Sequence, residues 1–199
     1  MISIYFGNPG SGKSTLACKM LKQQVKHRPA FANFEHKVKG AMFGDLRGLG
    51  QWTFPDGTFA VIDEAGIEYN SRKYKFLSQE AIAYFKKHRH HRHDLVFFSQ
   101  SWEDIDVTIR RLADQYWYIT KIGPFTLSHR IYKRVTVDKN TEQIIDGYRM
   151  ASPFWLLFWP LQLGWPFAPQ FKLTFRPFYY KYFDSWSKDP LPVRDFPVA

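Results

Sequence analysis

The segment from Gly7 to Ser14 constrains the fold more than any other part of this chain, because it matches the phosphate-binding pattern G-x-x-x-x-G-K-S/T. The apolar run from Ile2 to Phe6 before it is typical of a strand, and the residues after it carry apolar side chains at helical spacing. A strand, a glycine-rich turn and a helix in this order point several backbone N–H groups and the positive end of the helix dipole at one position. The segment therefore predicts a site for the phosphates of a nucleotide.

Two residues at the end of this loop have distinct expected roles. Lys13 is placed to reach the β- and γ-phosphates, and the Ser14 hydroxyl is placed to hold Mg²⁺. A chance match to the pattern in a chain this long occurs roughly one time in a hundred, and the flanking strand and helix lower that figure. We therefore expect ATP and Mg²⁺ as ligands, bound by Asn8, Pro9, Gly10, Ser11, Gly12, Lys13, Ser14 and Thr15.

The alternation of strand-like and helix-like segments predicts the fold class. The predicted strands cover residues 1–6, 31–34, 59–62, 95–98 and 116–122, and the predicted helices cover residues 13–27, 78–90 and 103–113. Apolar strands separated by helices of this length favour an α/β fold with a mostly parallel, doubly wound sheet flanked by helices. This is the fold class of P-loop NTPases.

The pattern of side chains changes after residue 124. Apolar residues alternate with polar ones from 125 to 149, and Asp138–Asn140 form a predicted turn, so we expect a β-hairpin at the edge of the sheet. Three parts follow: a P-loop ATPase core over 1–124, the hairpin over 125–149, and an aromatic, proline-rich C-terminal extension over 150–199.

Residues 150–171 carry no charge, and about 22 residues is a length that could cross a bilayer. Four prolines interrupt the segment and oppose a helix, namely Pro153, Pro160, Pro166 and Pro169. Tryptophans 155, 159 and 165 favour an interfacial or partner-binding surface. Contact with a membrane surface and packing on the domain or on a neighbouring subunit both stay open.

Charge and cysteine content narrow the partners and the environment. The net charge is +10, which suits an acidic partner such as DNA, RNA or an anionic membrane, although basic charge alone is weak evidence. Cys18 is the only cysteine of the chain, so an intrachain disulfide is excluded. Its place on the first predicted helix indicates a buried, inert thiol.

An acidic strand end supplies the expected second half of the nucleotide site. Asp63 and Glu64 follow the buried strand 59–62. Asp63 is placed to bind Mg²⁺, directly or through water, and Glu64 to polarise the water that attacks the γ-phosphate. Gln100, after the strand 95–98, is the candidate sensor of the γ-phosphate; a role in capping the next element is an equal alternative.

Basic side chains offer candidates for neutralising charge in a transition state. Oligomeric ATPases take an arginine from a neighbouring subunit for this purpose, and the candidates are Arg89, Arg92, Arg110 and Arg111. A solvated or DNA-facing role is the alternative for each of them. The histidine-rich run 88–93 lacks acidic or cysteine partners, so we expect a partly charged basic patch rather than a metal site.

The order and approximate spacing of these residues resemble those of the Zot-like (zonula occludens toxin-like) proteins, the assembly and export ATPases of filamentous bacteriophages and a branch of the FtsK/HerA type of P-loop motor. The similarity extends from residue 1 to about residue 186. It is carried by Asp63–Gly66, Asn70–Arg72, Phe85, Arg89, Asp94–Gln100, Ile105, Asp106, Arg110, Ala113, Asp114 and the C-terminal element Tyr179–Trp186, whereas the phosphate loop is common to many families.

The resemblance implies an ATP-hydrolysing, membrane-associated homo-oligomer, with a ring as the expected form. It would act in the host cytoplasm, at the cytoplasmic face of the inner membrane, and would extrude phage single-stranded DNA as the DNA is coated. Its partners would be this DNA or its coat complex and the inner-membrane phage assembly proteins. The family's arginine positions fall on Arg89 and Arg110, and the resemblance assigns the other roles as above.

Many family members continue past the ATPase core into a membrane helix. In this chain the uncharged stretch lies before the Tyr179–Trp186 element and contains the four prolines. We therefore expect either a member that docks on a separate membrane protein, or contact between residues 150–171 and the membrane surface.

Two alternative functions remain open at this point. One is a genome-packaging ATPase of the FtsK/HerA type, and the other is a nucleotide-gated membrane adaptor without sustained turnover. The presence of Glu64 argues against the adaptor, because a binding switch does not need a carboxylate that polarises water.

Overall fold

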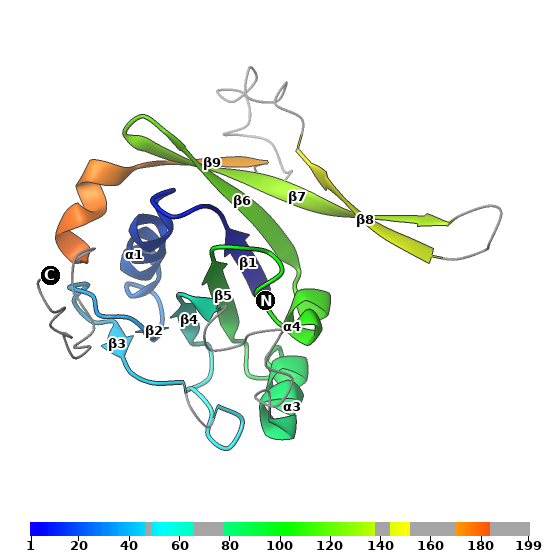
Figure 1. Cartoon of the computed structure of the whole chain (residues 1–199). Coiled ribbons are helices and arrows are strands. Elements are labelled where there is room, and N and C mark those ends of the chain that lie inside the picture. Colours follow the sequence, from blue (N-terminus) through cyan, green and yellow to red (C-terminus); the bar gives the residue numbers. More distant parts are fainter. Residues whose placement is uncertain (47–48, 66–77, 138–143, 152–169, 184–199) are drawn as a thin grey trace, which may run out of the picture.

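One sheet organises the structure, a computed structural model that describes residues 1–46, 49–65, 78–137, 144–151 and 170–183. The strand order is β3-β2-β4-β5-β1-β6-β7-β8, and β9 also pairs with β7 (Figure 1). Six strands run parallel: β1 (Ile2–Phe6), β2 (Ala30–Ala32), β3 (Met42–Phe43), β4 (Phe59–Ile62), β5 (Asp94–Ser99) and β6 (Gln115–Ile122). Three are antiparallel to their neighbours: β7 (Phe125–Val137), β8 (Ile144–Met150) and β9 (Phe171–Phe175).

Helices cover both faces of the parallel part of the sheet (Figure 1). On one face, α1 (Lys13–Gln24) packs Leu16 and Leu21 against Tyr5, Phe98 and other strand residues. On the other face lie α3 (Gln79–Lys87) and α4 (Val107–Leu112). Because both faces are buried, the central strands are apolar at nearly every position instead of alternating.

The predicted fold class is confirmed. Each predicted strand is present, with its ends shifted by no more than two residues, and the hairpin of β7 and β8 lies at the edge of the sheet. The first helix ends at Gln24 rather than at residue 27. The helix predicted over 103–113 begins only at Val107, because the Asp106 carboxylate accepts a hydrogen bond from Thr108 N at 2.7 Å and caps the first turn.

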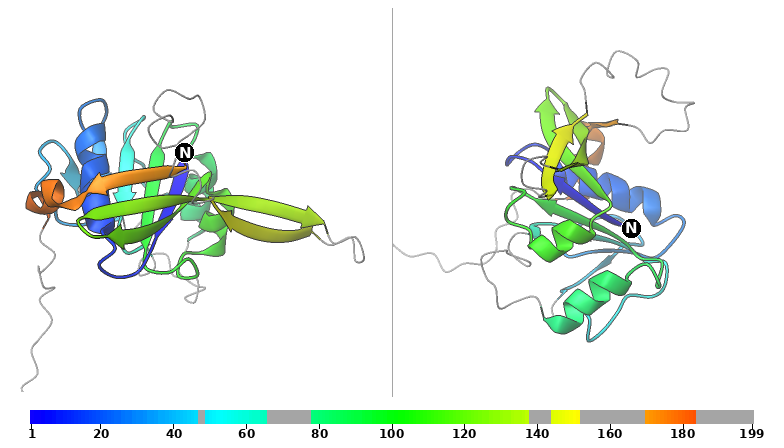
Figure 2. Two further views of the ribbon diagram at one scale, coloured as in Figure 1. Left: turned by 90° about the horizontal axis from the view of Figure 1, so that it is seen from above. Right: turned by 90° about the vertical axis from the view of Figure 1, so that its right-hand side faces the viewer.

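The hairpin of β7 and β8 was predicted, but the antiparallel contacts of β7 with β6 and β9 were not. This strand pairs with β6 through Phe125–Ile131, while β9 and β8 share its other edge end to end. The far half of β7 and β8 projects beyond the body of the domain as a two-stranded arm (Figures 1 and 2). The pairing of β7 with β9 joins residues more than forty positions apart, and side-chain periodicity does not contain such a register.

The C-terminal part of the described chain returns to the first helix. Lys19 Nζ of α1 donates hydrogen bonds to Leu173 O at 3.1 Å and Thr174 Oγ1 at 2.9 Å of β9. After β9, the 3₁₀ helix η2 (Arg176–Tyr182) follows. Tyr182 and Phe183 pack against the apolar cluster formed by α1 and the sheet face beneath it. Cys18 is fully buried there, and burial raises the pKa of its thiol to about 12, so the prediction of an inert thiol is confirmed.

Several predictions fall on residues outside the described ranges. These are the turn at Asp138–Asn140, most of the uncharged segment with Trp155, Trp159 and Trp165, and the end of the family element from residue 184 onward. The division of the chain into three parts stays a prediction. Among the helices that the structure describes, none has the length and apolar character that a bilayer crossing requires.

A close contact between β7 and the phosphate loop explains one glycine. Gly12 has a φ of +98°, and a Cβ atom there would lie 2.0 Å from Thr126 Oγ1 of β7. The Thr126 hydroxyl is buried and donates a hydrogen bond to Ser11 O at 3.0 Å. Any side chain at position 12 would therefore have to adopt a left-handed backbone and displace β7.

We expect Gly12→Ala to lower the free energy of unfolding by at least about 2 kcal/mol, since it adds left-handed strain to overpacking. Urea denaturation measures this. Gly57→Ala is the matched control, because Gly57 also has a positive φ, of +78°, but no atom within 4 Å of the added Cβ. The control should lose only the backbone contribution, about 1 kcal/mol; equal losses in both variants would mean that the contact with Thr126 does not matter.

Candidate nucleotide site

The phosphate loop lies at the carboxyl end of β1 and leads directly into α1, for which Gly12 is the N-cap. Lys13 Nζ donates hydrogen bonds to Gly7 O at 2.6 Å and to Asn8 O at 3.1 Å, which hold the ammonium beside the loop. Partial burial lowers the pKa of Lys13, although Asp63 and Glu64 oppose this shift. A cation that is poorly solvated in this way gains from an anionic ligand.

The structure brings the hydroxyl at the start of α1 to the acidic strand end. Ser14 Oγ donates a hydrogen bond to Asp63 Oδ2 at 3.2 Å, although β5 separates β4 from β1 in the sheet. Both oxygens are of the type that Mg²⁺ prefers, and they lie close enough to share one ion. The pair predicted to hold Mg²⁺ is therefore together in space.

Asn33 anchors this acidic residue and was not predicted as a site residue. Its side-chain oxygen accepts a hydrogen bond from Asp63 N at 2.7 Å, and its side-chain nitrogen donates one to Asp63 O at 3.0 Å. These two bonds to the backbone continue the pairing of β2 with β4 by one more residue. Sequence reasoning placed Asn33 inside the strand 31–34, whereas β2 ends at Ala32. The sequence offered one signal for this role, namely a polar residue at the end of a predicted strand, as Asp63 is at the end of another.

Burial raises the pKa of Asp63, and the neighbouring Glu64 carboxylate raises it further. Hydrogen bonds from Glu64 N and Ser14 and the charge of Lys13 act in the opposite direction. Burial prevails because water is the best solvent for the negative charge. A bound cation would favour the ionised carboxylate.

Two further predicted catalytic residues, Glu64 and Gln100, lie along the same edge of the sheet. Glu64 is exposed, has a φ of +50°, and donates its N–H to Asp63 Oδ1 at 2.9 Å. A left-handed backbone at a residue other than glycine costs about 1 kcal/mol or more and is concentrated at functional sites. Gln100 is also exposed and follows β5, the strand between β1 and β4. Asp63, Glu64 and Gln100 thus end adjacent parallel strands beside the phosphate loop.

The two predicted arginines make their contacts in different places, and only Arg89 is clearly remote from the phosphate loop. Arg89 forms an ion pair with Asp114, whose other oxygen accepts from Ile2 N at 2.8 Å, so Arg89 lies at the amino end of β1, opposite the loop. Arg110 lies on α4 with its guanidinium carbon 5.5 Å from the centroid of the Trp102 ring. A role for either one between subunits stays a prediction.

The prediction of a basic histidine patch is wrong for two of its members. His88 and His93 are buried, and His93 lies between Tyr84 Oη at 2.8 Å and Pro55 O at 3.1 Å. Burial lowers the pKa of both rings, so they are neutral near pH 7 and serve the packing of α3.

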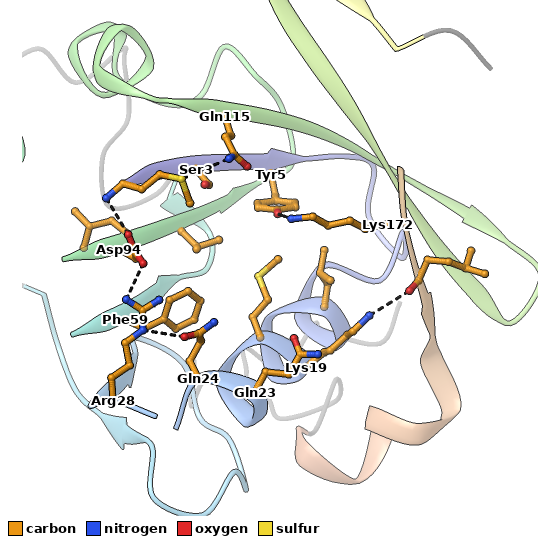
Figure 3. A pocket seen from close by; sticks show the side chains of 16 residues that line it. Ser3, Tyr5, Lys19, Gln23, Gln24, Arg28, Phe59, Asp94, Gln115 and Lys172 are labelled. Carbon is orange, nitrogen blue, oxygen red and sulfur yellow. Dashed lines mark hydrogen bonds and ion pairs between the residues drawn. The ribbon is translucent and has the colours of Figure 1, made fainter. Parts of the chain in front are cut away.

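Two cavities lie beside the sheet, and the smaller one is next to the phosphate loop. A cavity of about 240 Å³ lies between residues 8–11 of the phosphate loop and residues 118–121 at the end of β6, on the opposite side of β1 from Asp63. A larger one, about 550 Å³, lies between α1, β9 and the amino ends of the strands (Figure 3). The larger cavity holds Lys172, whose pKa burial lowers to about 8, but it is at the wrong edge of the sheet for the phosphates.

Thr126 and Arg176 also contact the loop and were not identified from the sequence. Thr126 binds Ser11 O as described, and Arg176 Nε lies 3.3 Å from the position of an ideal Cβ on Gly12. Thr126 lies on β7 and Arg176 is the first residue of η2, both more than 110 residues away along the chain, and no motif marks them. The sequence carried no signal for this contact.

The loop, the acidic edge and the sheet order define the class: this is the fold of a P-loop NTPase. The family model for zonular occludens toxin (Zot) matches residues 36–154, more than half of the chain. The chain belongs to the Zot family, and the phosphate loop lies before the matched region.

A comparison with solved structures found similar chains. The N-terminal domain of zonular occludens toxin from Neisseria meningitidis is 18% identical, with a TM-score of 0.51, over 76% of this chain and 94% of that chain. The genome packaging NTPase B204 from Sulfolobus turreted icosahedral virus 2, in complex with ATP-gammaS, is 14% identical, with a TM-score of 0.49, over 73% of this chain and 95% of that chain. No curated protein matches the sequence.

The raised pKa of Asp63 predicts a pH-dependent effect of Asp63→Asn. A carboxyl whose folded pKa lies above its unfolded pKa stabilises the fold while protonated, and this contribution is lost as the pH rises through the folded pKa. We expect the variant to melt at a higher temperature than the wild type at about pH 8, with no difference at about pH 3. Thermal denaturation across this range measures it.

Glu64→Gln is the control for the loss of a carboxylate at the same edge, because Glu64 is exposed. A stability difference for Asp63→Asn that is the same at all pH values would contradict the role of burial. We also expect Asp63→Asn to lose the Mg²⁺ dependence of nucleotide binding.

Proposed function

We propose that this protein is an ATP-hydrolysing motor that assembles and exports filamentous phage by extruding single-stranded DNA at the inner membrane of the host. The observation that carries the ATPase part is the contact of Ser14 Oγ with Asp63 Oδ2 at 3.2 Å, next to Glu64 and to the phosphate loop. Membership of the Zot family supports the phage-export part.

In the proposed reaction, the backbone N–H groups of the loop and Lys13 bind the phosphates of ATP, and Ser14 and Asp63 hold Mg²⁺. Glu64 accepts a proton from the water that attacks the γ-phosphorus, while the bond from this phosphorus to the β–γ bridging oxygen breaks. The products are ADP and inorganic phosphate. Gln100, directly after β5, the strand between β1 and β4, registers the loss of the γ-phosphate.

The motor part of the proposal rests on charge and on the family. A net charge of +10 suits a chain that handles DNA near an anionic membrane. We propose a homo-oligomeric ring at the cytoplasmic face of the inner membrane, with phage DNA or its coat complex and inner-membrane assembly proteins as partners. Arg89 or Arg110 would then act on a neighbouring subunit's nucleotide.

Steady-state ATP hydrolysis with and without single-stranded DNA tests the proposal. We expect turnover that DNA stimulates, and a loss of at least about a hundredfold in Glu64→Gln and Lys13→Ala. The two variants should differ in binding, because Glu64→Gln leaves the phosphate and metal contacts in place and Lys13→Ala does not. Wild-type rates in Glu64→Gln would assign the proton acceptor to another residue.

Flotation with anionic liposomes tests the location. We expect the purified protein to float and the triple variant Trp155→Ala, Trp159→Ala, Trp165→Ala to remain at the bottom of the gradient, because tryptophan favours the membrane interface. DNA-stimulated turnover without flotation under any condition would favour genome packaging instead. Absent turnover with DNA and membranes both present would favour the nucleotide-gated adaptor.

A further inference from the structure

We propose that Arg176 binds the α-phosphate of the nucleotide held by the phosphate loop of the same chain. This proposal rests on the proposed nucleotide binding and adds a residue that neither the phosphate-loop pattern nor the acidic strand end includes. It differs from an arginine donated between subunits, because Arg176 already lies against its own loop.

The backbone of Arg176 is held in place from two sides. Its N–H donates a hydrogen bond to Pro124 O at 3.0 Å in the turn between β6 and β7, and the preceding residue, Phe175, pairs with Phe125 of β7. Lys19 ties β9 to α1 two to three residues earlier. Arg176 is therefore positioned relative to both α1 and β7, the two elements that enclose the end of the phosphate loop (Figure 1).

The guanidinium lies at the last glycine of that loop. Arg176 Nε is 3.3 Å from the position that a Cβ on Gly12 would occupy, beside Thr126 Oγ1, which binds Ser11 O. Nε is buried and has no hydrogen-bond partner among the described residues. The side chain instead lies against an aromatic ring, with its guanidinium carbon 5.8 Å from the centroid of Tyr180.

A buried N–H of a charged group without an acceptor costs free energy, so this arrangement is stable only if the fold compensates for it or a ligand supplies the acceptor. Among the described residues, no carboxylate forms an ion pair with Arg176, and the loop beside it is built for phosphate. The planar fork of arginine matches phosphate oxygens, which gives strong, charge-assisted hydrogen bonds.

The sheet order indicates which phosphate Arg176 contacts. Asp63, Glu64 and Gln100 end β4 and β5, on one side of β1, and they define the γ-phosphate end of the site. Arg176 comes from the opposite side, next to β7, and the cavity lined by residues 118–121 of β6 lies on that side as well. A nucleotide oriented between these two ends presents its α-phosphate, not its γ-phosphate, to Arg176.

Binding of ATP, ADP and AMP to the full chain, measured by calorimetry in the presence of Mg²⁺, tests the proposal. We expect Arg176→Ala to weaken ATP and ADP by the same factor, about tenfold to a hundredfold, because both nucleotides carry the α-phosphate. Arg176→Lys keeps the charge but not the fork, and we expect an intermediate loss for both. AMP binding should fall by a similar factor.

Arg130→Ala is the matched control, since Arg130 is an arginine of β7 that contacts the rings of Trp117 and Tyr132 and not the loop. It should leave all three affinities within about twofold of the wild type. Unchanged affinities in both Arg176 variants would overturn the proposal, as would a loss confined to ATP, which would place the arginine at the γ-phosphate. A wild-type chain that binds no nucleotide would overturn the nucleotide site itself.

Discussion

The parallel pairing of β1 with β5 on one side and β6 on the other is the constraint on which the rest of the structure depends. In parallel strands the carboxyl ends meet at one edge, so the loop after β1 lies beside the residues that follow β5 and β4. This pairing brings Ser14 within 3.2 Å of Asp63 although 49 residues separate them. The site is a property of this edge rather than of any single segment.

The charged groups of the site depend on the same geometry for their chemistry. Burial lowers the pKa of Lys13 and raises that of Asp63, so each charge is less favourable than in water. A phosphate and a metal ion are the ligands that relieve these two costs. Stability of the free protein is reduced at the positions where binding is favoured, a frequent feature of functional sites.

How far the sequence predicts the structure depends on the range of the interaction. The strands, α1, the phosphate loop and the Asp63–Glu64 edge follow from local patterns, because each is a continuous run whose side chains match its backbone. Asn33, Thr126 and Arg176 could not be found this way, since their partners lie 30 residues or more away along the chain. In the histidine-rich run 88–93, a local pattern gave a wrong prediction. Its composition predicted a basic surface patch, but His88 and His93 are buried.

The amino-acid sequence by itself determined the class of fold, the position of the phosphate loop and the position of Asp63 and Glu64 at a strand end, because glycine conformation, helix dipole and apolar strands act over a few residues. Only the tertiary structure decided which distant groups close around that loop. The return of β9 and η2 onto α1 places Arg176 beside Gly12, and the antiparallel β7 makes glycine necessary there. Strand register and packing across the sheet set these contacts, and a linear pattern of residues does not encode them.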